Sequence, residues 1–206
     1  GSLVKTRALY RGVMEDIYST YTTAATGTAF PFTDVAESRW SYPYIKELYD
    51  AGVVSGTSAT TFSPAANVTR AQFVTMLAGL AGADVSNCPA TPFRDVSEGA
   101  WYAPYVNWAL ANGIVSGTSA ATFSPDASIT RQDMAVMLYS YTQRFQVHLQ
   151  QQPVTPFTDA GSIAAYAQVA VQTLQRAGVI SGMPDGSFQP YGTATREQAC
   201  TVLCML

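Results

Sequence analysis

The chain of 206 residues has few charged side chains and a single histidine. Asp, Glu, Lys and Arg together make up 12% of the residues, and 11 Lys and Arg against 14 Asp and Glu leave a net charge of −3. A nucleic-acid-binding surface normally needs a dense basic face, so no nucleic-acid partner is expected. Metal-dependent hydrolysis needs a set of His-rich ligands, which this composition does not supply.

Cysteine is also scarce. Three cysteines are an odd number for a chain of this size, so no disulfide framework is implied. Cys200 and Cys204 lie one helical turn apart and are interpreted as small buried hydrophobic residues rather than as metal ligands. Cys88 lies in a linker and is expected to be a free thiol, and the lone His148 is expected at the surface. We predict neither a metal site nor a cofactor.

No apolar run approaches the length of a membrane span, although 48% of the residues are hydrophobic. Membrane insertion is therefore not expected. The chain opens with Gly1-Ser2, which is typical of an expression scar and shows no signal-peptide pattern, so we expect a piece of a longer protein. A chain of this length can bury about 70% of its unfolded surface, which is enough for a sizeable core.

A five-residue motif occurs three times. The stretch Val68–Gln72 (VTRAQ) returns as Ile129–Asp133 (ITRQD) and as Ala194–Gln198 (ATREQ). Each copy places a Thr three residues ahead of Gln or Asp and just before an apolar run, which is the pattern of a capping box at a helix N-terminus. The motif predicts three helices whose N-caps are Thr69, Thr130 and Thr195.

Each motif closes a longer unit. The interval from a Ser-Gly pair to the motif Arg is 14 residues in all three units. An earlier amphipathic segment in each unit predicts a helix-loop-helix, and a further helix is predicted over 3–22. One helix-loop-helix of this length cannot bury both of its apolar faces, so an all-α fold with a shared core is expected. The predicted divisions are 1–29 (N-terminal helix and linker), 30–84, 91–149 and 155–206.

The motif places a cation at the first position of each helix. Unpaired backbone N–H groups and the helix dipole already make this end positive, so an Arg there needs a partner. The partner is either a carboxylate of the chain itself or an anion that arrives with a ligand. One aspartate recurs in each unit about 36 residues before the Arg, and it is either a salt-bridge partner or cap, or part of the ligand site. The arginines are Arg70, Arg131 and Arg196, and the aspartates are Asp34, Asp95 and Asp159.

Taken together, Phe-x-Asp-Val, a downstream Trp, Gly-Val-Val-Ser-Gly, Phe-Ser-Pro and Val-Thr-Arg-Ala-Gln closely resemble the S-layer homology repeat of bacterial surface proteins. The resemblance covers 30–206. It implies a secreted protein at the bacterial cell wall or surface layer, with three repeats in a pseudo-threefold, three-pronged helical domain. It also implies non-covalent anchoring, in which grooves between prongs hold a secondary cell-wall polysaccharide that often ends in a pyruvate-ketal N-acetylmannosamine, and in which the motif Arg is central.

The resemblance gives further residues two alternative roles. Trp40 and Trp101 either offer flat apolar faces to a sugar ring or belong to the core. One glycine per unit either lets the backbone approach a ligand or serves a turn. The third unit has Ala165-Tyr166 where the others have Trp, and one residue more, so fewer than three equivalent sites are expected. The glycines in question are Gly56, Gly117 and Gly182.

The sequence leaves two other functions to consider. Glycoside hydrolysis needs two carboxylates at a set separation, whereas most acidic residues here recur with the repeat or lie in predicted exposed segments. No catalytic residue is therefore predicted, although an enzyme could be attached in the full-length protein. The alternative to polysaccharide binding is a protein-protein or self-assembly module of a surface layer, which would expose a broad apolar patch.

Overall fold

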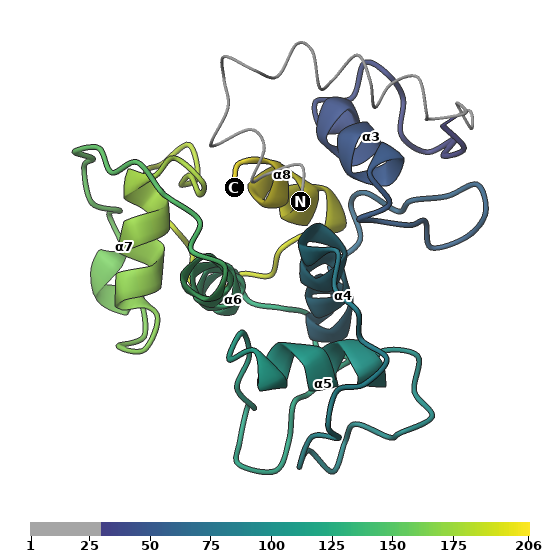
Figure 1. The fold of residues 1–206 in the computed structure, drawn as a ribbon. Coiled ribbons are helices and arrows are strands. Elements are labelled where there is room, and N and C mark those ends of the chain that lie inside the picture. Colours follow the sequence, from purple (N-terminus) through teal and green to yellow (C-terminus); the bar gives the residue numbers. More distant parts are fainter. Residues whose placement is uncertain (1–29) are drawn as a thin grey trace.

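The computed structural model describes residues 30–206, and within that range the fold is helical without strands (Figure 1). The predicted all-α class is confirmed, and the helix expected over 3–22 lies outside the described residues. The helices are α3 (Tyr42–Asp50), α4 (Arg70–Ala81), α5 (Ala103–Ala111), α6 (Arg131–Arg144), α7 (Gln168–Arg176) and α8 (Arg196–Cys204), with a 3-10 turn η1 at Ala160–Ser162.

The helices form a central set and an outer set. Helices α4, α6 and α8 lie around the middle, and α3, α5 and α7 form three prongs around them (Figure 1). The outer helix of each repeat packs against the central helix of the preceding repeat: α5 on α4, α7 on α6, and α3 on α8. A prong is thus built from two repeats, and the first repeat closes the ring on the third.

Backbone hydrogen bonds join the three repeats at the centre. Val68 N–H donates to the Ala194 carbonyl oxygen at 3.0 Å, Ala194 N–H to that of Ile129 at 3.2 Å, and Ile129 N–H to that of Val68 at 3.0 Å. All three side chains are fully buried. Because each residue directly precedes the cap of a central helix, this closed ring brings the three helix starts together.

The central helices begin where the capping motif predicts. The hydroxyls of Thr69, Thr130 and Thr195 each accept a hydrogen bond from the backbone N–H three residues on. Helices α4 and α8 complete the capping box, because Gln72 and Gln198 accept from the backbone N–H of their Thr. The box is incomplete at α6, which carries Asp133 at this position.

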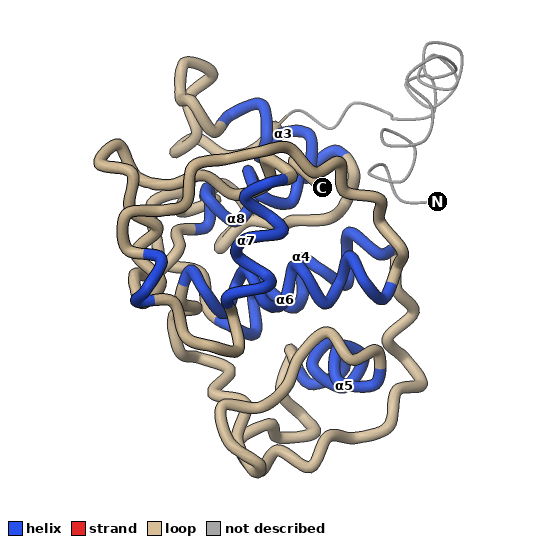
Figure 2. Tube along the Cα trace, turned by 90° about the vertical axis from the view of Figure 1, so that its left-hand side faces the viewer, coloured by secondary structure: helices blue, strands red, loops and turns tan. Residues whose placement is uncertain are grey.

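Cys200 and His148 lie where the sequence predicts them. Cys200 is buried, Cys88 and Cys204 are partly buried, and none of the three forms a disulfide within residues 30–206. His148 is exposed. No helix between 30 and 206 is long and apolar enough to cross a bilayer. Long loops connect the helices (Figure 2), and these loops carry the residues that the central arginines contact.

Candidate functional site

Each central helix starts with an Arg that reaches the loop of the next repeat. Its Nε donates to a Phe carbonyl oxygen at 2.7 or 2.8 Å, and its guanidinium lies over the ring of the same Phe, 4.4 to 5.0 Å from the ring centre. We name these places the Arg70, Arg131 and Arg196 junctions. The pairs are Arg70 with Phe123, Arg131 with Phe188, and Arg196 with Phe62.

The helix N–H groups at the junctions are already bonded. Arg70 N–H donates to the carbonyl oxygen of Ala127 at 2.9 Å, and Ala71 N–H donates to that of Pro125 at 3.0 Å. The third N–H group, that of Gln72, donates to the Thr69 hydroxyl. The same pattern holds at α6 and α8. The expectation of free N–H groups ready for an anion is therefore wrong, because the loop of the neighbouring repeat runs across each helix start. The partner of the Arg is chiefly a carbonyl rather than a carboxylate.

Part of each guanidinium nevertheless remains available. Arg131 and Arg196 each donate once more, from Nη2 to the carbonyl oxygens of Ser181 (3.1 Å) and Ser55 (2.9 Å). Their remaining nitrogen, Nη1, has no partner within residues 30–206. No fully buried side-chain nitrogen in that range lacks a hydrogen bond, so both Nη1 groups reach the surface. Burial lowers the pKa of both side chains, yet a guanidinium stays cationic.

The recurring aspartates hold the loops in shape. The Asp34 carboxylate accepts from the backbone N–H groups of Phe62 (2.8 Å) and Ser63 (2.7 Å) and so fixes Ser63 at a φ of 57°. Asp95 and Asp159 do the same in their repeats. None of the three forms an ion pair with a described Arg. Their structural role is therefore established, and it takes the form of loop bonding rather than a salt bridge or a helix cap.

The pKa of Asp95 reflects this loop bonding. Desolvation alone would raise it, but the N–H groups of Phe123 and Ser124 and the charge of Arg70 outweigh that effect and lower the pKa. The carboxylate form is thus favoured where the loop needs an acceptor.

The three loop glycines allow close packing inside the loop. A Cβ at Gly56 would overlap the carbonyl oxygens of Ser58 and Thr61 and the ring of Phe32. Gly117 is enclosed in the same way, and a Cβ at Gly182 would lie 2.8 Å from the Ser187 carbonyl oxygen. This packing explains the glycines without a ligand, so a ligand contact at these positions stays a prediction.

The aromatic residue ahead of each outer helix is exposed. Trp40 is 56% exposed and Trp101 is 59% exposed, so the core interpretation is wrong. Tyr166 holds the same place two residues before α7 and is 63% exposed. The side chains can stay in solvent because the segment before each outer helix lies on the surface of its prong.

Glu197 is a buried acid that the sequence did not single out, and it links the first repeat to the third. The Glu197 carboxylate accepts from Arg39 Nε (2.8 Å) and Nη2 (2.9 Å) and from the Ser41 hydroxyl (2.6 Å). Desolvation would raise the pKa of Glu197, but these hydrogen bonds and the Arg39 charge lower it. The other two motifs have Ala71 and Gln132 here, so the repeat pattern gave no signal for this bond.

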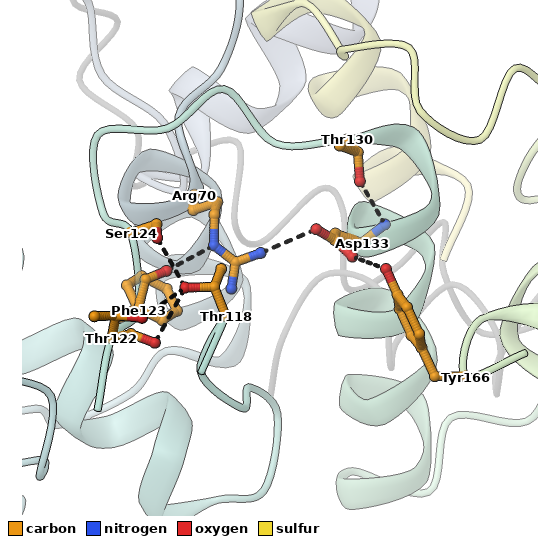
Figure 3. A network of polar contacts seen from close by, with 8 residues as sticks. All are labelled: Arg70, Thr118, Thr122, Phe123, Ser124, Thr130, Asp133 and Tyr166. Atoms are coloured by element: carbon orange, nitrogen blue, oxygen red, sulfur yellow. Dashed lines mark hydrogen bonds and ion pairs between the residues drawn. The ribbon is translucent and has the colours of Figure 1, made fainter. Parts of the chain in front are cut away.

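The Arg70 junction differs from the other two (Figure 3). Arg70 Nη1 pairs with Asp133 Oδ2 at 3.3 Å, and the Tyr166 hydroxyl donates to Asp133 Oδ1 at 2.7 Å. The Tyr166 side chain as a whole is exposed, but desolvation of its hydroxyl and the hydrogen bond to Asp133 raise its pKa to about 12. Here the chain supplies its own carboxylate to the motif Arg.

Comparison with known proteins agrees with the repeat pattern. The model of the S-layer homology domain matches residues 31–74, 92–135 and 156–200. The chain is 38% identical over its whole length to an endoglucanase of Bacillus sp. (strain KSM-635). It is 27% identical over 94% of its length to an S-layer protein of Bacillus thuringiensis subsp. finitimus. It is 28% identical over 74% of its length to a cellulosome-anchoring protein of Acetivibrio thermocellus.

The chain spans only a part of these relatives. It covers 22% of the endoglucanase, 22% of the S-layer protein and 35% of the cellulosome-anchoring protein. The shared region is therefore one module that occurs beside different companions.

Proposed function

The chain belongs to the S-layer homology family, and on that premise we propose that it anchors a larger protein by binding an anionic secondary cell-wall polysaccharide at its junctions. Domains of this family anchor proteins to the cell surface, and membership indicates an extracellular, cell-wall-associated location. The ligand proposed is a wall glycan whose sugar carries a compact permanent carboxylate, such as a pyruvate ketal.

The surface-reaching nitrogens of Arg131 and Arg196 carry this proposal. Each belongs to a guanidinium that is otherwise enclosed and is held in place by hydrogen bonds to two backbone carbonyl oxygens. A carboxylate that reaches it gains a charge-assisted hydrogen bond where water is partly excluded, and the Arg loses no side-chain freedom. The same nitrogen attracts a neutral sugar far less.

The exposed tryptophans supply the second part of a sugar site. Trp40 precedes α3, which packs on α8, and the residues beside it contact Glu197, the residue next to Arg196. Trp101 precedes α5, which packs on α4. An exposed indole can lie against the apolar face of a sugar ring and keeps its N–H for a hydrogen bond. Tyr166 holds the equivalent place beside α6 and belongs to the Arg70 junction through Asp133. Repeat symmetry thus assigns Trp40 to the Arg131 junction and Trp101 to the Arg196 junction.

A ligand-side experiment tests the proposal without altering the fold. Calorimetric titration compares a synthetic monosaccharide that carries a pyruvate ketal with the same sugar without the ketal. The loss of one charge-assisted hydrogen bond should weaken binding at least about tenfold. Equal binding of both sugars, or binding of neither, would overturn the proposal.

The tryptophans are tested by substitution. Replacing both Trp40 and Trp101 with Ala should weaken binding of the ketal sugar while the helical circular dichroism stays unchanged, because both side chains are exposed. The matched control is Val154→Ala, which removes an exposed apolar side chain in a linker. A double variant that binds as tightly as the control would rule out sugar stacking at these residues.

We assign no catalysis to the module itself. The relatives include an endoglucanase and an S-layer protein, and the chain matches 22% of each. An attached enzyme would carry its own active site. Incubation of the chain with cell-wall glycan should therefore release no reducing ends.

Self-assembly is the second candidate, because large apolar side chains are exposed. Tyr191 and Val169 are 66% and 61% exposed, in addition to the tryptophans. Such side chains can pair copies of the module in a surface layer. Sedimentation equilibrium without glycan separates the two functions: a monomer at micromolar concentration contradicts self-assembly, and a dimer that dissociates when Trp40 and Trp101 are removed supports it.

A further inference from the structure

We propose that Asp133 closes the Arg70 junction by taking the place of the ligand carboxylate, so that the polysaccharide binds at the Arg131 and Arg196 junctions only. This inference rests on the proposed function and refines it. The three junctions have the same backbone plan, and they differ in the residue at the third position of the following central helix.

That position decides whether a side chain is free to face the Arg. At α8 and α4 it is Gln198 and Gln72, and each turns back to accept the N–H of its own cap at 3.0 and 3.1 Å. At α6 it is Asp133, whose side chain is one methylene shorter and makes no bond to Thr130 N–H. The Asp133 carboxylate instead faces Arg70 (Figure 3).

The guanidinium of Arg70 responds to this carboxylate. Arg131 and Arg196 donate their second hydrogen bond to the carbonyl oxygens of Ser181 and Ser55, respectively. The equivalent carbonyl in the second repeat belongs to Ser116, and within the described residues Arg70 makes no bond to it. Arg70 has exchanged a neutral acceptor for a negatively charged one on Nη1, while its Nη2 makes no hydrogen bond within residues 30–206.

Tyr166 fixes the carboxylate from the other side. Its hydroxyl bonds Oδ1 of Asp133 while Arg70 bonds Oδ2, so both oxygens are occupied. The third repeat can do this because it carries Tyr instead of Trp, with one extra residue between Asp159 and the aromatic position. The aromatic side chain that would meet a sugar is thereby used in an internal bond.

The charge balance at the Arg70 junction disfavours a second anion. The Arg70 charge is compensated at 3.3 Å by Asp133, whose side chain is three-quarters buried. A sugar carboxylate would have to displace Asp133 or lie beside a like charge. No ion pair compensates Arg131 or Arg196 among the described residues.

The test is Asp133→Gln, which gives α6 the residue that α4 and α8 already carry. The helix start should keep its stability because Gln completes the capping box. Titration with the ketal monosaccharide should then show one additional bound sugar per chain, and Arg70→Lys in the same background should remove it. Tyr166→Phe, which deletes only the hydroxyl, should loosen Asp133 and allow weak binding at Arg70.

Side-chain NMR of isotope-labelled arginine locates the bound sugar. In the unmodified chain the sugar should shift the Nε–H signals of Arg131 and Arg196 but not that of Arg70; in Asp133→Gln it should shift all three. An Arg70 signal that already shifts in the unmodified chain, or an unchanged number of sites in Asp133→Gln, overturns the inference but leaves the proposed function standing. Failure of every variant to bind the sugar overturns both.

Discussion

The guanidinium of Arg196 lies 4.4 Å from the centre of the Phe62 ring, although 134 positions separate the two residues in the chain. Arg196 Nε also donates to the Phe62 carbonyl oxygen at 2.8 Å. Phe62 belongs to the first repeat and Arg196 to the third, so this contact closes the ring of repeats. The motif Arg therefore has a structural task whether or not a ligand is bound.

Replacing Arg196 with Ala should lower the free energy of unfolding by about 3 kcal/mol, because the carbonyl oxygens of Phe62 and Ser55 lose a partner and the cation-ring contact is lost. Arg196→Lys should be intermediate, since an ammonium group cannot reproduce the guanidinium fork. Urea unfolding followed by circular dichroism measures both. The control is Arg94→Ala, at an exposed position. An Arg196 variant as stable as this control would contradict the closing role.

The loop glycines give a second prediction with an internal control. Gly117→Ala should destabilise the fold by about 3 kcal/mol, because the new Cβ overlaps the backbone of Ser119 and Thr122. Gly113→Ala should have an effect of only about 1 kcal/mol: its φ of +67° disfavours a side chain, but no atom lies in the way. Thermal unfolding ranks the two variants, and the reverse order would show that the loop can open to admit a side chain.

Local features of the fold could be predicted from the sequence. The caps Thr69, Thr130 and Thr195 lie three residues from the backbone N–H groups that donate to them, so the motif alone contains the interaction. The helical class and the repeat followed from the same patterns. Tyr166 and the extra residue of the third unit predict that the three sites are not equivalent, and in the structure Tyr166 donates a hydrogen bond to Asp133.

Contacts between repeats could not be predicted. Near-identical repeats produce the same apolar pattern whether an outer helix packs within its own repeat or on the preceding one, so the pairing of α3 with α8 left no signal. For the same reason the sequence could not show that the Phe62 carbonyl oxygen, rather than a carboxylate, receives Arg196. A recurring Trp such as Trp40 likewise does not reveal which way its side chain faces.

Ser63, which has a strained backbone conformation, offers a third prediction. Ser63 has a φ of 57°, a conformation that Gly adopts without penalty, and its hydroxyl bonds Thr57 at 2.7 Å. Ser63→Ala and Ser63→Gly both lose the hydroxyl, and only the Gly variant relieves the backbone. Ser63→Gly should therefore be more stable than Ser63→Ala by about 1 kcal/mol in urea unfolding.

The same loop should depend on Asp34, because this carboxylate bonds the N–H groups that hold Ser63 in place. Asp34→Ala should lower the free energy of unfolding by about 2 kcal/mol. Asp34→Asn keeps one acceptor oxygen and should lose less. If the Ser63 variants are equal and Asp34→Ala has no effect, the loop geometry is not under strain.

Tyr166 provides the last prediction, through its titration at high pH. Its pKa is raised to about 12 by desolvation of the hydroxyl and by the hydrogen bond to Asp133, and that of the buried Tyr141 is raised to about 12 by desolvation alone. Asp133→Gln removes the negative acceptor, so the pKa of Tyr166 should fall back toward 10.0 while that of Tyr141 stays unchanged. NMR of ring-labelled tyrosine resolves the two residues.

The sign of the stability change follows from these pKa values. The unfolded chain releases the phenol proton near pH 10.0 and the folded chain near about 12, so folding favours the neutral phenol. The contribution is fully present below pH 10 and is lost as the pH rises toward 12. In Asp133→Gln the decline of unfolding free energy above pH 10 should be shallower, because only Tyr141 then retains the full shift. An unchanged decline, together with an unchanged Tyr166 pKa, would mean that Asp133 and Tyr166 are not bonded in solution.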